Sequence, residues 1–178
     1  MKKIGYLFPK SHSDGYLKNY LRMVWYKLYY PAAFYAAALS SSVVSMDYGI
    51  LTEGALRIEK EIFELMNEHY CADSEKNNIS EILRIGVECY DNGITFLPAD
   101  VNKSHPELFT VENGAIRLPF NVPRRLSKEK CEMLCRERII KPFFNKEELR
   151  ERVGLTVEDI TNLQDNHALE LLSGADRA

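Results

Sequence analysis

The chain has 178 residues, of which 46% are hydrophobic and 28% are charged, with a formal net charge of −3. This length and composition suit one globular domain with at most a small appendage. No apolar run is long enough to span a membrane, and the sequence after Met1 is too polar for a signal peptide. We therefore expect no membrane contact, a cytoplasmic location and reduced thiols at the four cysteines.

The charges are distributed unevenly along the chain. Residues 1–36 hold six lysines and arginines against one acid, and residues 117–152 hold eleven against six. Residues 47–116 hold fourteen acids against five cations, and residues 153–178 hold five against one. The net charge argues against nucleic-acid binding, but the two basic segments would concentrate positive potential if the fold brought them together. Ordinary scatter of charge is the alternative.

The first predicted helix is long and amphipathic. Pro9 keeps the preceding residue out of the α region, and Ser13 or Asp14 is suited to cap the first free N–H groups, so we expect the helix to begin there. Apolar residues then recur at helical spacing, which predicts that this side of the helix faces a core. They are Leu17, Leu21, Val24 and Leu28.

A second stripe on the same helix combines cations with aromatic residues: Lys18, Arg22, Trp25 and Tyr29. Lysine and arginine bind phosphates and flat rings stack on bases, so this pattern is typical of a nucleic-acid-binding surface. The alternative is a solvated helix face with large aromatic side chains half-buried at its edges. Helical spacing does not separate the two interpretations.

The rest of the first half is also predicted to be helical. Pro31 suits the first turn of a second helix, which the serines at 40–42 end. Residues 51–69 have the apolar periodicity of a third helix. We expect a polar loop over 71–78 and then a fourth helix over 79–91, which Asn92 and Gly93 terminate.

The second half begins with short strands. Residues 94–97 read as a strand, and Asn113-Gly114 between two β-prone runs predicts a hairpin over 108–118. From Ser127, an N-cap, the pattern is helical again, over 127–138, 146–152 and 157–165, with a last turn or helix over 167–172. The sequence therefore predicts a mainly α fold with a small β-hairpin.

Three blocks of residues occur in an order and spacing that resemble one protein family. The first holds Tyr6, Phe8, Pro9, Lys10, His12 and Tyr16, followed by Tyr26, Lys27, Pro31, Phe34, Tyr35 and Ala36. The second holds Gly93, Phe96, Asp100, Ser104, Pro119, Phe120 and Asn121, and the third is residues 144–150. Together they resemble the C-terminal fingers and helix-hairpin-helix region of the PolC-type DNA polymerase III alpha chain, a C-family DNA polymerase.

The resemblance implies a division into three parts. Residues 1–93 would form a helical fingers-like region, 94–122 short strands and a hairpin, and 123–178 a helix-hairpin-helix-like unit. It also implies that Lys10, His12 and Tyr16 bind the incoming nucleotide. In the family, glycines in the helix-hairpin-helix present backbone N–H groups to DNA. Here Arg124 and Arg125 stand in that turn, so their side chains would contact the phosphates instead.

The family is a DNA-directed DNA polymerase, but the sequence contains no Asp-x-Asp pair to hold the catalytic metal ions. We therefore expect no catalytic residue, cofactor or metal ion in this chain, and no polymerase activity from it alone. Mg²⁺ would be held by a palm domain that is not present in these 178 residues, and a separate palm chain is one candidate partner. No clamp-binding peptide of the family's type is seen. Cys131 and Cys135 are four residues apart, which favours buried thiols over a zinc site.

The function implied is that of a fragment or stand-alone relative of a PolC-type polymerase, which binds a primer–template duplex and incoming nucleotide. The alternative is a non-catalytic interaction protein, or a relic, on the same fold. Salt-dependent DNA binding would distinguish them.

Overall fold

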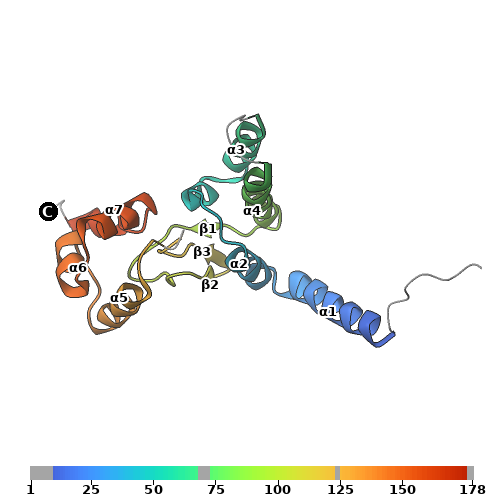
Figure 1. The fold of residues 1–178 in the computed structure, drawn as a ribbon, viewed down its shortest axis with the longest axis horizontal. Helices are drawn as coiled ribbons and strands as arrows, with labels where there is room; N and C mark the ends of the chain where they lie inside the picture. Colours follow the sequence, from blue (N-terminus) through green and yellow to red (C-terminus); the bar gives the residue numbers. More distant parts are fainter. Residues whose placement is uncertain (1–9, 68–72, 123–124, 176–178) are drawn as a thin grey trace, which may run out of the picture.

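The computed structural model describes residues 10–67, 73–122 and 125–175 (Figure 1). Helices form most of it and surround a small central sheet. The predicted mainly α fold with a small β-hairpin is confirmed. The elements in chain order are α1 (Lys10–Tyr29), α2 (Pro31–Ser41), η1 (Tyr48–Glu53), α3 (Ala55–Asn67), α4 (Asp73–Asp91), β1 (Phe96–Leu97), β2 (Thr110–Glu112), β3 (Ala115–Arg117), α5 (Lys128–Ile140), α6 (Lys146–Val153), α7 (Val157–Asp165) and η2 (Glu170–Ala175).

The sheet has the strand order β1-β3-β2. β2 and β3 form the predicted hairpin, and Asn113 and Gly114 take φ values of 53° and 85° at its turn. Both central residues of a type I′ turn need positive φ, which explains the Asn-Gly pair. β1 pairs with β3 in parallel, with Phe96 opposite Ile116. The sequence predicted the strand at β1 but not its place in the sheet.

Two predicted boundaries in the first half are wrong. The predicted helix over 51–69 is divided, because Gly54, at a φ of 98°, separates η1 from α3. The predicted loop over 71–78 is helical from Asp73 onward. Lys76 and Ser80, one turn apart, are both buried, so α4 has a buried side well before its apolar pattern begins.

The prediction for α1 is wrong in two respects. The helix begins at Lys10 and not at Ser13 or Asp14. The apolar side assigned to a core is exposed instead: Leu17 and Leu21 are 56% exposed and Leu28 is 72% exposed. The physical reason is the course of the helix, because α1 runs away from the rest of the molecule and packs mainly on α2 (Figure 1).

One continuous core connects the helical first half, the sheet and the C-terminal helices. Its largest fully buried side chains come from all three parts, which makes the chain from α2 onward a single folding unit. They include Tyr35, Leu39, Ile58, Ile82, Ile116, Phe120, Leu134, Phe143, Leu149 and Leu163. None of the helices in the described part of the chain is long and apolar enough to cross a membrane.

Candidate nucleic-acid interface

The cationic and aromatic stripe of α1 is open to solvent. Lys18, Arg22, Trp25 and Tyr29 are all exposed, and Trp25 is 47% exposed despite its size. The rings of Trp25 and Tyr29 lie against each other, with their centroids 5.2 Å apart and their planes tilted by 38°. Within the described residues no carboxylate forms an ion pair with Lys18 or Arg22. The structure thus places the four predicted residues together on one accessible surface.

Two more aromatic residues join this surface. The ring centroids of Tyr26 and Tyr30 lie 5.3 Å and 5.4 Å from that of Trp25, and both side chains are more than half exposed. The sequence analysis missed them because neither falls on the stripe at helical spacing. The sequence did contain a pattern that could have indicated them, namely four aromatic residues within the six positions 25–30. Exposed rings so close together provide a stacking surface beside two cations.

The predicted nucleotide-binding residues lie in the first two turns of α1. The side chains of Lys10 and His12 lie outside the part of the chain that the structure describes. The helical backbone places positions 10 and 12 about 200° apart around the axis, whereas positions 12 and 16 share one side. Tyr16 is exposed. A role for these residues in nucleotide binding stays a prediction.

The predicted DNA-binding turn before α5 is held by an internal side chain. Arg124 lies outside the described residues. The backbone N–H groups of Arg125 and Leu126 both donate to Asn121 Oδ1, at 3.0 Å and 2.8 Å. The amide of Asn121 in turn donates to the carbonyl of Leu126. These two N–H groups are therefore occupied within the protein and are not available to a phosphate.

The N-termini of the three C-terminal helices are capped in the same inward manner. Ser127 accepts from the N–H of Lys130 at the start of α5, and Asn145 accepts from that of Glu148 in α6. At α7, Thr156 and Asp159 form a reciprocal capping box. Each first turn also carries an acid. The positive N-terminal end of a helix dipole attracts anions such as phosphate. A carboxylate in the first turn already interacts with this end and repels a phosphate there.

Most cations of the C-terminal unit are paired within the protein. Lys130 lies 2.5 Å from Asp159, Lys141 2.8 Å from Glu148, and Arg125 3.4 Å from Asp165. The Lys130–Asp159 and Lys141–Glu148 pairs are within hydrogen-bonding distance, whereas the Arg125–Asp165 contact is longer. Among the described residues, these carboxylates offset part of the positive charge counted over 117–152, which the sequence alone did not reveal.

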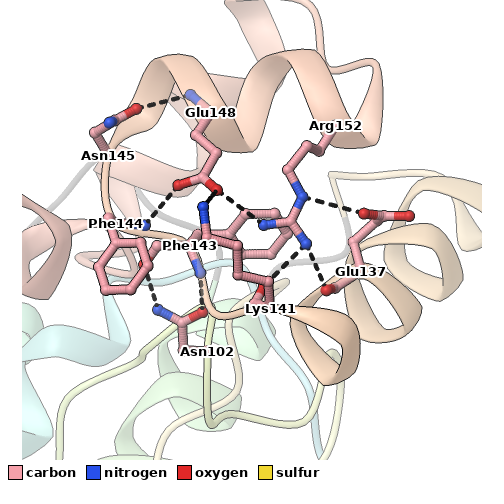
Figure 2. Close-up of polar contacts among 8 residues, drawn as sticks. All are labelled: Asn102, Glu137, Lys141, Phe143, Phe144, Asn145, Glu148 and Arg152. Atoms are coloured by element: carbon pink, nitrogen blue, oxygen red, sulfur yellow. Dashed lines mark hydrogen bonds and ion pairs between the residues drawn. The ribbon is translucent and has the colours of Figure 1, made fainter.

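Arg152 and Glu148 are the centre of this pairing (Figure 2). Hydrogen bonds from Lys141 and from the N–H of Phe144 lower the pKa of the Glu148 carboxyl, so the acid stays ionised near neutral pH. Arg152 donates to Glu137 and Glu148 together. The contacts join the end of α5 to α6.

The two predicted DNA-binding regions are not neighbours. α1 lies at one end of the molecule and α5, α6 and α7 lie at the other (Figure 1). The stripe of α1 and Arg125, just before α5, therefore do not form one site. Among the described residues, Lys18 and Arg22 of α1 form no ion pair with a carboxylate, whereas Arg125 is paired with Asp165.

Of the two cysteines predicted to be buried, Cys131 is buried and Cys135 is only partly so, and Cys89 is buried as well. Burial raises the pKa of the Cys131 thiol to about 11 and that of Cys89 to about 12, so both stay protonated at neutral pH. The sulfur of Cys131 accepts from the Asn121 amide at 3.2 Å. In residues 10–67, 73–122 and 125–175, no three His, Cys, Asp or Glu side chains gather to hold a metal ion.

Comparison with known proteins identifies the relatives of this chain. The sequence pattern of the helix-hairpin-helix motif family matches residues 93–178. The "DNA polymerase III PolC-type" of Thermotoga maritima is 32% identical over 159 residues, which cover 89% of this chain and 12% of that protein. Proteins of the same name from Clostridium perfringens and Lacticaseibacillus paracasei are 29% and 28% identical over 169 residues, which cover 95% and 94% of this chain.

The matched residues make up 12% of the length of each relative. The same residues make up about nine-tenths of this chain. The matched segment runs from the region of α1 into the C-terminal helices. This extent confirms the resemblance that the three residue blocks predicted. The chain is a relative of PolC-type DNA polymerase III over about 90% of its length, and its residues 93–178 match the helix-hairpin-helix motif family.

Proposed function

We propose that the chain binds DNA as the primer–template-contacting part of a PolC-type DNA polymerase, and that α1 is the surface that contacts the DNA. The observation that carries this proposal is the stripe of α1. Lys18 and Arg22 are exposed and form no ion pair with described residues, and the exposed rings of Trp25 and Tyr29 lie beside them. Cations that have no internal partner are free to replace the counterions of a phosphate backbone.

The two kinds of side chain have different tasks in this proposal. Lys18 and Arg22 are one helical turn apart, so they contact neighbouring phosphates without regard to sequence. The rings around Trp25 stack on unpaired bases, such as those of the template strand beyond a primer end. This division favours a primer–template junction over a blunt duplex.

The C-terminal unit contributes less to binding in this proposal. Its helix N-termini are capped by their own side chains, and the N–H groups of Arg125 and Leu126 donate to Asn121. The side chain of Arg125 is half-exposed and only loosely paired with Asp165, so it supplies an auxiliary phosphate contact. Binding therefore depends on side-chain charge more than on backbone N–H groups.

The catalytic carboxylates and Mg²⁺ belong to a palm outside these 178 residues in this proposal. The sequence has no Asp-x-Asp pair, and in the described residues no acidic cluster gathers to hold a metal ion. The incoming nucleotide would bind at Lys10, His12 and Tyr16, next to that palm. We expect the purified chain by itself not to extend a primer with Mg²⁺.

Fluorescence anisotropy with a labelled primer–template junction tests the proposal. Between about 50 mM and about 200 mM salt, affinity should fall linearly on a double-logarithmic plot. The double variant Lys18→Ala/Arg22→Ala should bind more weakly and lose about one unit of slope for each phosphate contact. Trp25→Ala should weaken binding to the junction more than to a blunt duplex of equal length.

The matched control removes the same charge elsewhere. Lys60 is exposed on α3 and Lys103 is exposed before the hairpin. The variant Lys60→Ala/Lys103→Ala should leave the slope unchanged. An equal loss of slope in both double variants would show that only net charge matters. Absence of binding at low salt would refute DNA binding and leave the interaction protein as the function.

A further inference from the structure

The side-chain amide of Asn121 organises the turn before α5. Asn121 is 1% exposed, and both atoms of its amide are fully used. Oδ1 accepts from the N–H groups of Arg125 and Leu126, whereas Nδ2 donates to the Leu126 carbonyl and to Cys131 Sγ, each at 3.2 Å. A buried polar network in which every group has a partner rigidifies the chain around it. The turn therefore has one fixed conformation at Arg125.

The contacts with Asn121 fix the backbone on both sides of Arg125. The two peptide groups that flank the Cα of Arg125 are the ones whose N–H groups donate to Asn121 Oδ1, at 3.0 Å and 2.8 Å. Each peptide group is planar, so fixing both of them fixes the direction of the Cα–Cβ bond between them. Asn121 is itself held in place, because its backbone N–H donates to the carbonyl of Pro106 at 2.8 Å.

The guanidinium of Arg125, in contrast, is accessible to a ligand. The side chain is 43% exposed, and Asp165 is its acidic partner among the described residues, with Nη1 and Oδ2 3.4 Å apart. An ion pair so open to solvent is weak. A guanidinium has five N–H donors, so a contact with Asp165 leaves other donors for a phosphate.

We propose that Asn121 is a positioning residue for DNA binding, which aims the guanidinium of Arg125 at a phosphate. This inference rests on the proposed function, in which Arg125 supplies an auxiliary phosphate contact. Asn121 is buried, so it acts through Arg125 and not by touching the DNA. A turn that is already fixed loses little conformational entropy when DNA binds, and this preorganisation increases the affinity.

Fluorescence anisotropy with a labelled blunt duplex tests the role of Asn121. A blunt duplex offers no unpaired bases to the rings around Trp25, so binding depends on phosphate contacts. Arg125→Ala should reduce the ratio of the affinities at about 50 mM and about 200 mM salt by about 3.5-fold, the effect of one lost contact. Asn121→Ala changes no charge, yet it should reduce the ratio by a similar factor, because Arg125 is no longer aimed. The double variant should lose no more than Arg125→Ala alone.

Asn102→Ala is the matched control for a loss of stability. The Asn102 amide donates to the carbonyl of Phe143 at 2.9 Å and accepts from its N–H at 2.8 Å, so it also joins two segments of backbone (Figure 2). This variant should lower the urea midpoint and leave the salt dependence of binding unchanged. Circular dichroism verifies that both alanine variants are folded under the conditions of the binding experiment.

Amide hydrogen exchange of the wild-type chain is a second measurement, and it needs no variant. The N–H groups of Arg125 and Leu126 should be protected, because both donate to a buried oxygen. Exchange at the rate of an open loop would show that the turn is not fixed, and it would refute the inference even if Asn121→Ala did not fold.

Three binding results would also refute the inference. They are an unchanged salt dependence in Asn121→Ala, an equal change in Asn102→Ala, and additive losses in the double variant, which would mean that Asn121 does not act through Arg125. In each of these cases the wild-type chain still binds DNA, so the proposed function stands. A wild-type chain that does not bind the duplex at low salt would refute both.

Discussion

Lys27 Nζ lies 2.5 Å from Glu88 Oε1 and connects α1 to α4 across 61 residues of chain. The same ammonium group lies 5.5 Å from the ring centroid of Tyr35, a fully buried residue of α2. Asn92, after the end of α4, donates to the Tyr35 hydroxyl. These contacts fix the C-terminal end of α1, while the rest of the helix projects into solvent. The orientation of the stripe of Lys18, Arg22, Trp25 and Tyr29 therefore depends on these contacts.

We predict that Glu88→Gln loosens α1 without unfolding the protein. The two side chains are each more than 40% exposed, so solvent screens the pair and its loss costs about 0.2–1 kcal/mol. Amide hydrogen exchange should accelerate in α1 and stay unchanged in α5. The variant Glu81→Gln, on an exposed position of the same helix α4, is the control and should show no change.

The pH dependence of this link follows from the carboxyl group. The hydrogen bond from Lys27 lowers the pKa of Glu88 below its ordinary value of 4.5. The contribution of the Lys27–Glu88 ion pair to stability is therefore fully present above pH 4.5, and it is lost as the pH falls through the lowered pKa of Glu88. Exchange in α1 that is independent of pH across the acidic range would contradict this role.

We predict that Leu21→Ala changes the free energy of unfolding of the monomer very little, by less than about 0.5 kcal/mol. Leu21 is 56% exposed, so truncation creates no cavity. Leu39→Ala is the matched comparison, because Leu39 is fully buried in α2, and it should cost about 2–5 kcal/mol. Urea denaturation at low protein concentration measures both. A large loss in Leu21→Ala would place the apolar side of α1 in a core after all.

The error about Leu21 shows what the sequence could reveal. Periodicity identified an apolar contact side of α1, but it cannot say whether the partner lies in the same chain. The resemblance likewise picked out Lys27 and Tyr35, yet their junction with Glu88 depends on a contact 61 residues away. Local signals did better: Asn113-Gly114 predicted its hairpin, and Ser127 as N-cap predicted the start of α5.

Charge counting failed for a related reason. The basic composition of 117–152 was correct, but most of its cations find carboxylates or carbonyls nearby. Arg138 shows this, since it donates to the backbone carbonyls of Val101 and Ser104. Tertiary packing decides which charged side chains form ion pairs between helices. A sequence therefore gives the number of charges but not the electrostatic potential at the protein surface.

Two glycines in helices should respond to alanine with opposite signs. At Gly86 in α4, an added Cβ would lie 2.7 Å from Leu51 Cδ2 and 3.3 Å from Ile58 Cδ1, and both neighbours are fully buried. Overpacking of this kind costs about 1–3 kcal/mol, more than the roughly 1 kcal/mol that alanine gains in helix propensity. Gly86→Ala should therefore lower the melting temperature.

Gly15→Ala is the matched control, because nothing lies within 4 Å of its added Cβ. Only the gain in helix propensity remains there, and the helicity of α1 should rise by circular dichroism. A Gly86→Ala variant as stable as the wild type would show that α3 and α4 pack more loosely than the structure indicates.

His167 should make stability depend on pH in the neutral range. A hydrogen bond to Glu170 raises its pKa above the ordinary 6.5, with a further contribution from Asp47 on the loop before η1. Glu53 also lines the small pocket beside the imidazole. The stabilisation is fully present below pH 6.5 and is lost as the pH rises through the raised value.

The variant His167→Asn isolates this effect. His167 has a φ of 57°, which asparagine adopts more readily than most residues, so the substitution removes the titrating group without adding backbone strain. Urea midpoints measured across neutral pH should show a component that falls with rising pH in the wild type and is absent in the variant. A parallel fall in both would assign the dependence to another group.

Arg152 should be the most important charged residue for the stability of the C-terminal unit. Its Nη2 donates to the carbonyls of Glu137 and Lys141, at 2.6 Å and 2.9 Å, and its Nε donates to the Glu137 carboxylate (Figure 2). The two carbonyls lie at the end of α5, where a helix runs short of backbone donors; the Glu137 carbonyl also accepts from the N–H of Lys141. The guanidinium also lies 4.5 Å from the ring centroid of Phe143.

Loss of this group removes the donor to the Lys141 carbonyl and to the Glu137 carboxylate, whereas the Glu137 carbonyl keeps the N–H of Lys141. Arg152→Ala should cost about 1.5–3 kcal/mol, the range for hydrogen bonds to charged groups. Arg152→Lys should recover only part, because an ammonium lacks the planar fork that reaches the Glu137 carboxylate and both carbonyls together. Arg150→Ala is the control, because Arg150 is exposed on the same helix, and it should stay within about 0.5 kcal/mol of the wild type. Equal losses in Arg152→Ala and Arg150→Ala would mean that charge, and not this set of contacts, stabilises the junction of α5 and α6.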